Sequence, residues 1–269
     1  MNAYCSIADI KAALGITATT DDTLIRKMCE SASRSIDNYT NRFFYCKTQT
    51  KYFDGAVPLR IDDLLSVTTL KTDEDGDGTF ENTLTVTTDY LLYALNTFPK
   101  TKVVLAVDSN YGSFGISKKG CEIAGLWGYG DGISATPYMV DTTLTAAISS
   151  TTATACTVTA VTNLSAGQTI LIDTEQMFIY SISTLTLTVE RGVNGTTAAL
   201  HDNSKLLYIY QYPYDVWQAC ISLASAVYQN RGKQGIQSER LGDYTYTLSK
   251  GYINSLLDDS IYAYRRVRA

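Results

Sequence analysis

The sequence predicts an α+β fold in which helices at both ends of the chain flank antiparallel β-structure. Three observations predict it. Apolar residues recur at helical spacing near both termini, and side chains alternate with a period of two from Phe43 to Gly128. A stretch rich in Thr, Ala and Ser follows, with only two basic residues, Arg191 and Lys205, between Tyr138 and Tyr212. Such β-branched sequences favour strands.

The N-terminal helices are predicted from their caps and their spacing. Ser6 can cap a helix that ends at Leu14, because Asp9 completes a capping box and Gly15 can stop the helix. A second helix is expected from about residue 21 to 39, where one face is apolar and the other polar.

Strands then dominate. We expect strands at about 43–52, 66–72, 79–93, 102–109 and 121–128. The second and third are joined by an acidic turn at 73–78, and a glycine-rich segment at 128–132 closes this region.

The next region predicts a separate module. Short alternating runs between residues 166 and 210, with turns at 166–167 and 193–195, indicate a compact all-β unit. We therefore expect two domains: 1–136 with 213–269, built of helices and strands, and an inserted sandwich- or barrel-like domain at 137–212.

Helical spacing returns after Pro213. The helix that runs to Arg231 is apolar on more than one side, so it is either central in its domain or pressed against a neighbouring subunit. A polar loop at 232–242, a short strand at 244–248 and a last helix at 252–264 with a basic end complete the chain.

Composition excludes several classes of protein. The 269 residues carry 22 basic and 27 acidic side chains, a formal charge of −5, which argues against a non-specific duplex-DNA binder. No apolar run approaches the roughly 18 residues of a membrane helix, and the first residues lack a signal peptide, so we expect a cytosolic protein without membrane contact. The six scattered cysteines indicate reduced, buried thiols. Tyrosine supplies 20 of the 29 aromatic residues, a composition that suits subunit contacts.

No pattern predicts an active site, so we expect no enzymatic activity. His201 is the only histidine and lies in a sequence typical of a turn. The sequence has no nucleophile elbow, phosphate loop or dinucleotide fingerprint. A hydrolase that uses Asp173 and Glu175 is the weakest alternative, because nothing sets these acids apart except a position between strand and turn.

One acidic cluster is a candidate metal site. Asp73, Asp75 and Asp77 followed by Gly78 match the first half of a calcium loop, and Glu81 could add a ligand. The twelfth position holds Leu84 instead of the bidentate Glu. The alternatives are an ordinary acidic hairpin turn and a weak Ca²⁺ site, and no other cofactor is expected.

Three stretches in order resemble the phage head-tail connector proteins of the gp6-like adaptor family. The first holds Ile7–Ile16, Asp21–Ile25 and Ile36–Arg42. The second holds Val67–Asp73 through Phe80, Asp89–Leu92 and Gly125–Gly130. The third holds Pro213–Arg231 and Tyr264–Arg266. Family members usually pass almost directly from the second stretch to the third, so the β module looks like an insertion.

The resemblance implies a structural protein of the virion neck, assembled in the host cytoplasm. It implies a homo-oligomeric ring, usually a dodecamer, that docks on the portal protein, binds a stopper or tail protein and lets DNA pass without specific binding. The residues that we expect at a subunit or portal interface are Trp217, Ile221, Tyr228, Arg231, Tyr264, Arg265, Arg266 and Arg268. The alternative is a peripheral virion module whose β domain binds a host glycan or a tail fibre.

Overall fold

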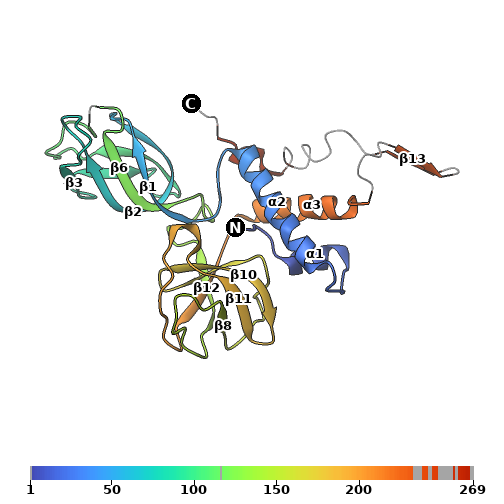
Figure 1. The fold of residues 1–269 in the computed structure, drawn as a ribbon. Helices are drawn as coiled ribbons and strands as arrows, with labels where there is room; N and C mark the ends of the chain where they lie inside the picture. Colours follow the sequence, from blue (N-terminus) through green and yellow to red (C-terminus); the bar gives the residue numbers. More distant parts are fainter. Residues whose placement is uncertain are drawn as a thin grey trace.

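The computed structural model describes residues 2–115, 117–232, 238–241, 244–247, 257 and 260–266. Within these residues three α-helices combine with two six-stranded antiparallel sheets (Figure 1). The fold is therefore α+β, which confirms the predicted class.

The helices gather around one core. α1 spans Ile7–Leu14, α2 spans Asp22–Thr40 and α3 spans Tyr214–Gln229. The predicted capping box is present at Ser6, whose hydroxyl accepts the backbone N–H of Asp9, while the Asp9 carboxylate accepts the backbone N–H of Ser6. The stop of this helix is also as predicted, since Gly15 ends α1 in the left-handed conformation with φ 67°.

α3 is central in this helical core. It packs against both α1 and α2, and its buried side chains occupy most of its circumference. The aromatic ring of Tyr4 and the terminal residues Leu257 and Ile261 close the same core. The two apolar sides of α3 are therefore both covered within the chain.

The first sheet is formed by β1–β6 in the order β1-β6-β2-β5-β4, with β3 paired to β2. Its strands are β1 Lys47–Phe53, β2 Leu59–Thr72, β3 Asn82–Leu84, β4 Tyr90–Tyr93, β5 Lys100–Leu105 and β6 Cys121–Trp127. Trp127, the last residue of β6, is fully buried in the core of this sheet, and its indole N–H donates to the carbonyl of Gln49 at 2.9 Å.

The single strand predicted at 79–93 is wrong. The structure breaks it into β3 and β4, because the Asp89 carboxylate accepts the backbone N–H of Thr85 at 2.7 Å and the chain turns there. Thr87 takes a left-handed φ of 70° in this turn. A side chain that satisfies a backbone donor locally competes with the ladder.

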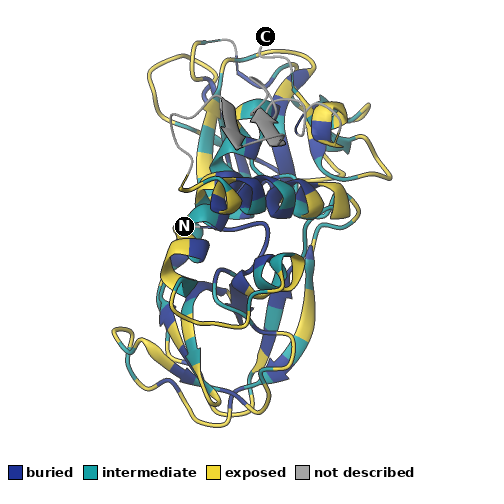
Figure 2. Cartoon of the chain, turned by 90° about the vertical axis from the view of Figure 1, so that its right-hand side faces the viewer, coloured by how far each residue is buried: buried dark blue, intermediate teal, exposed yellow. Residues whose placement is uncertain are grey.

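The second sheet has the order β7-β12-β9-β10-β11-β8. Its strands are β7 Tyr138–Thr143, β8 Ala155–Thr157, β9 Thr169–Ile172, β10 Glu175–Ser183, β11 Thr186–Glu190 and β12 Leu206–Tyr210, with a short 3₁₀ turn η1 at Val193–Gly195. The N–H of Thr159 donates to the carbonyl of Thr143 at 2.9 Å, so the chain after β8 returns to β7 and closes the sheet. Figure 2 shows that buried residues occur along these strands.

The end of the chain is described only in part. β13, Ser238–Leu241, pairs with β14, Tyr244–Thr247. The loop predicted at 232–242 was therefore wrong at β13, while the strand predicted at 244–248 matches β14. Tyr262–Tyr264 forms a 3₁₀ turn, η2, and most of the helix predicted at 252–264 lies outside the described residues.

Candidate assembly surfaces and the domain junction

The basic C-terminal motif lies against its own chain. The Tyr264 ring packs edge-on to Phe44 and Tyr129, with centroids 5.6 and 5.4 Å away, and burial raises its pKa to about 12. The Arg266 guanidinium pairs with Asp62 at 2.9 Å, and its backbone N–H donates to the carbonyl at the end of α2.

The neighbouring arginines differ in what the structure describes. The Arg265 guanidinium lies 5.7 Å from the Tyr39 ring centroid. Arg268 lies outside the described residues. A portal or subunit role for these residues stays a prediction.

The four predicted interface residues at α3 also contact their own chain. Ile221 is buried, and the Trp217 indole N–H donates to Asp9 at 3.2 Å. The Tyr228 hydroxyl donates to Asp21 at 2.6 Å, and the Arg231 guanidinium lies 3.8 Å from the Tyr228 ring centroid. These contacts hold the helical core, and an interface role stays a prediction.

Two other tyrosines of the helical unit face solvent. Tyr214 at the start of α3 is 85% exposed and Tyr262 in η2 is 62% exposed. Sequence reasoning missed both, because no pattern separates an exposed tyrosine from the many buried ones. Exposed aromatic rings with a polar tip suit a surface that becomes covered on assembly.

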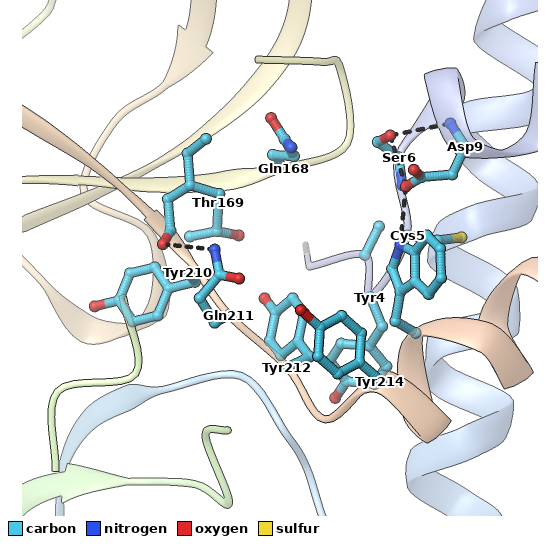
Figure 3. A pocket seen from close by; sticks show the side chains of 13 residues that line it. Tyr4, Cys5, Ser6, Asp9, Gln168, Thr169, Tyr210, Gln211, Tyr212 and Tyr214 are labelled. Atoms are coloured by element: carbon cyan, nitrogen blue, oxygen red, sulfur yellow. Dashed lines mark hydrogen bonds between the residues drawn. The ribbon is translucent and has the colours of Figure 1, made fainter. Parts of the chain in front are cut away.

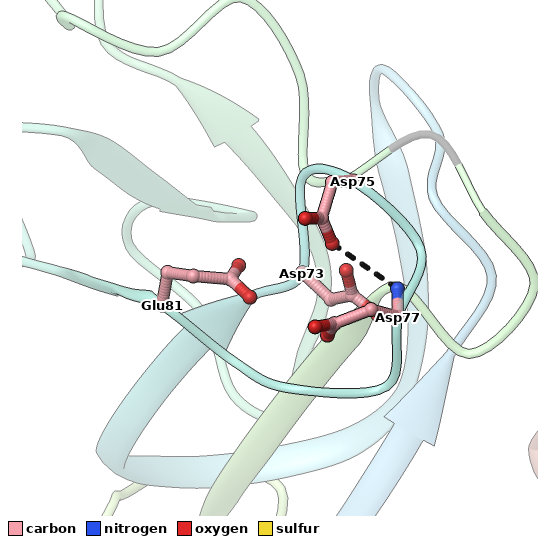
Figure 4. A group of neighbouring side chains, drawn as sticks. All are labelled: Asp73, Asp75, Asp77 and Glu81. Carbon is pink, nitrogen blue, oxygen red and sulfur yellow. Dashed lines mark hydrogen bonds between the residues drawn. The ribbon is translucent and has the colours of Figure 1, made fainter.

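The predicted metal cluster comes together in the loop after β2. One carboxylate oxygen from each of Asp73, Asp75, Asp77 and Glu81 lies within 4.8 Å of the others (Figure 4). Each carboxylate also accepts backbone N–H groups. Asp73, which is buried, binds those of Gly76 and Gly78 at 2.7 and 2.9 Å. The geometry fits both an acidic turn and a cation site.

A buried ionic network lies inside the second sheet. Glu175 is fully buried and binds the Arg191 guanidinium through both oxygens, at 2.7 and 2.8 Å. His201 is 3% exposed and lies between two carboxylates, with Nε2 2.8 Å from Glu175 and Nδ1 2.9 Å from Asp173. Burial opposes the charge on Glu175, but hydrogen bonds from Arg191, two backbone N–H groups and His201 lower its pKa.

This network brings together the two acids of the hydrolase alternative and the lone histidine. Their partners are one another, Arg191 and the surface Lys205, which pairs with Asp173 at 2.9 Å. Sequence reasoning placed His201 in a turn and did not join it to Glu175, because the residues are 26 positions apart. The arrangement ties the η1 region to β10.

The second sheet joins the rest of the chain through buried polar groups. Gln176 on β10 donates to the carbonyl of Cys46 at 3.1 Å, and Asn194 in η1 exchanges hydrogen bonds with Asn2 at 2.7 and 2.8 Å. The Thr169 hydroxyl donates to the Asn2 side chain at 2.9 Å. We call these contacts, together with the approach of Gly195 to β1, the domain junction.

An apolar cluster and a backbone contact complete the junction. Cys46 and Leu65 of the first half share one buried cluster with Leu171 and Tyr210 of the second sheet. The turn η1 lies so close to β1 that a Cβ on Gly195 would be 2.0 Å from the carbonyl oxygen of Thr48.

A cavity of about 180 Å³ opens beside the junction, between the first residues of the chain, the end of β12 and the start of α3 (Figure 3). Tyr210, Tyr212 and Tyr214 line one part, and Cys5, Ser6 and Asp9 line another. The cavity therefore reaches the helical core from solvent.

Comparison with known proteins gives one match. Residues 4–66 match the family model of the phage gp6-like head-tail connector protein. The matched part spans α1, α2, β1 and the first half of β2. The comparison with curated proteins gives no match.

The match confirms the first of the three resemblances. The second and third stretches and the interpretation of the β module as an insertion lie outside residues 4–66 and stay predictions. No helix among the described residues has the length and apolar character needed to cross a bilayer. The match supports a structural connector role in a phage particle, and residues 4–66 are similar to the phage gp6-like head-tail connector family.

Proposed function

We propose that the protein forms an adaptor ring that docks on the portal at the capsid vertex, binds a stopper or tail protein and lets DNA pass. The match of residues 4–66 carries the proposal, because it covers the helix pair on which the rest of the helical core is built. A dodecamer and a place in the virion neck follow from the same family resemblance.

The charge of the chain supports passage of DNA. A channel wall that gathered Lys and Arg would bind phosphates and release counterions, which would hold the DNA in place. The net charge of −5, with Arg26, Arg34 and Arg42 each paired to an acidic side chain, argues against a strongly cationic channel wall.

The exposed tyrosines of the helical unit are the contacts that we propose for assembly. Tyr214 and Tyr262 point an aromatic ring to solvent beside residues that are already held within the chain. Tyr262 lies two residues before the predicted interface motif from Tyr264 to Arg268. A partner that covers Tyr262 would therefore also contact this motif.

The experiment is mass photometry of the purified chain, alone and mixed with the portal protein of the phage that encodes it. We expect a closed ring, or a ring that forms only on the portal. The double variant Tyr214→Ser/Tyr262→Ser should weaken the complex, whereas Met139→Ser, an exposed residue of β7, should not. A chain that stays monomeric and ignores the portal would refute the proposal.

The alternative, a peripheral module that binds a host glycan or a tail fibre, predicts a different result. Its β domain would bind host cells or isolated fibres whether or not portal is present. Binding of the labelled chain to host cells, without any portal complex, would favour that function.

A further inference from the structure

Two cysteines meet in the helical core although they lie 215 positions apart in the sequence. The Sγ atoms of Cys5 and Cys220 are 3.0 Å apart. Cys5 belongs to the segment before α1, and Cys220 lies in the middle of α3. Both are buried, and both are free thiols.

The surroundings favour a pair of thiols and not a metal site. Cys29 on α2 is the nearest further cysteine, and its carbonyl accepts from the Cys220 thiol at 3.7 Å. Within the described part of the chain, the only group of three or more potential metal ligands is the acidic loop at Asp73–Glu81. The sulfurs of Cys5, Cys29 and Cys220 do not form such a group, although the Cys29 thiol also hydrogen-bonds with Cys5 and helps to raise the pKa of Cys5.

Solvent has a path to the pair. Cys5 lines the cavity of about 180 Å³ beside the domain junction and is 4% exposed, so the pair lies next to a space that opens to solvent. The remaining cysteines of the sheets, Cys46, Cys121 and Cys156, are buried as well, and none of them has a described contact to a second cysteine sulfur.

We propose that Cys5 and Cys220 are a disulfide-forming pair that closes when the protein meets a peroxide. One thiol gives up its proton and its thiolate attacks a peroxide oxygen. The O–O bond breaks, and the hydroxide that leaves takes up the released proton, so that a sulfenic acid and water result. The second sulfur then attacks the sulfenic sulfur and expels hydroxide, which takes up the proton of the second thiol. The sum is two thiols and one hydrogen peroxide to one disulfide and two waters.

The bond would fasten the first residues of the chain to α3. Both six-stranded sheets lie between Cys5 and Cys220 in the sequence, so the disulfide closes a loop that contains the domain junction. Such a cross-link lowers the conformational entropy of the unfolded chain and thereby stabilises the fold. Thiols stay reduced in a cytosol and oxidise outside it. If the proposed function holds, the oxidation would accompany release of the particle from its host. Formation of the disulfide itself does not depend on the proposed function.

The test counts thiols in the full chain. The protein is purified with reductant, freed of it, and treated in the folded state with hydrogen peroxide. It is then denatured, titrated with a chromogenic disulfide and mapped by mass spectrometry without reduction. We expect the six thiols of the reduced chain to fall to four, with a loss of 2 Da and one linked pair of peptides that hold Cys5 and Cys220. The melting midpoint should rise by roughly 5 °C or more, and reductant should reverse the rise.

Matched variants locate the bond. Cys5→Ser and Cys220→Ser should each keep all five remaining thiols under the same treatment, whereas Cys156→Ser should lose two. The wild-type map decides the matter even if a core variant does not fold. Six thiols after oxidation, or a link to Cys29 or between chains, would overturn the proposal. Because the assay needs no portal, failure of the ring proposal would leave its result unchanged.

Discussion

Substitution of Gly195 by alanine tests the domain junction. A Cβ at this position would lie 2.0 Å from the carbonyl oxygen of Thr48 and 3.1 Å from its carbon, whereas real Cβ contacts essentially never fall below 3.0 Å. The two bodies must therefore separate by about 1 Å or distort locally. Such a shift also stretches the hydrogen bond from Gln176 to the Cys46 carbonyl, which is 3.1 Å long.

Gly15 serves as a control that separates the steric overlap at Gly195 from the cost of backbone strain. Gly195 has φ +79°, and Gly15 has φ +67° with no atom within 4 Å of the place that an alanine methyl group would take. A left-handed φ costs an alanine about 1–2 kcal/mol at either site. Steric overlap adds about 1–3 kcal/mol only at Gly195. We therefore expect Gly195→Ala to lower the free energy of unfolding by about 2 kcal/mol more than Gly15→Ala does.

Urea denaturation of the full chain measures this difference, and hydrogen exchange locates it. Amide protection should fall in β1 and η1 for Gly195→Ala, and in the last turn of α1 for Gly15→Ala. Equal losses of stability in the two variants, with unchanged exchange in β1, would refute the close contact between the second sheet and β1.

Three further predictions concern charged groups. Glu175→Ala leaves a buried guanidinium unpaired, so we expect a loss of about 3–5 kcal/mol in urea denaturation. Lys205→Met removes an exposed ion pair and should cost far less than Glu175→Ala does, and equal costs would contradict this reasoning. Burial raises the pKa of Asp37 to about 7, so the folded chain holds this proton more tightly than the unfolded chain. The free energy of unfolding should therefore fall by about 2 kcal/mol as the pH rises from about 5 to 8, and Asp37→Asn should remove most of this pH dependence. An unchanged pH dependence in the variant would show that Asp37 is not its source. Calorimetric titration with CaCl₂ separates the two alternatives at Asp73–Glu81. A weak site should give heat of binding with a Kd of about 10⁻⁴–10⁻³ M that Asp75→Asn abolishes, whereas an ordinary acidic turn should give none.

Local signals made the helical part predictable. The capping box at Ser6, the stop at Gly15 and the apolar face of the second helix are all written within a few neighbouring residues, and the structure has each of them. The same holds for the helix after Pro213, where α3 begins at the next residue. Caps and spacing act over three or four positions, so a single sequence contains them.

Contacts between distant residues were not predictable. Asp62 and Asp63 are adjacent acids, a pattern that in sequence alone is typical of solvated side chains. Asp63 is nevertheless 5% exposed and pairs with Arg42 at 2.9 Å, while Asp62 pairs with Arg266. The acidic side chains from Asp73 to Glu81 lie close together because they belong to one loop, and metal binding there stays a prediction.

The apolar character of α3 was ambiguous for a related reason. A helix with two apolar sides looks the same in sequence whether a second subunit or its own chain covers it. The structure supplies the cover from α1, α2 and the terminal residues, so Ile221 and Tyr228 are core residues of one chain. Any contact with another subunit must therefore use the residues that the helical core leaves exposed.

The contacts of the second sheet bear on whether it can be removed. An inserted module that only points outward could be deleted with little effect on the ring. Here its residues cover Cys46 and Leu65, hold Asn2, and accept the backbone N–H of Ile7 at the start of α1 through the carbonyl of Ala166 at 3.2 Å. All four of these partners except Asn2 lie within residues 4–66, the part that matches the connector family. Deletion of 138–212 would therefore uncover buried groups on the matched segment itself. The hydrogen bond from Ile7 to Ala166 therefore couples the second sheet directly to α1.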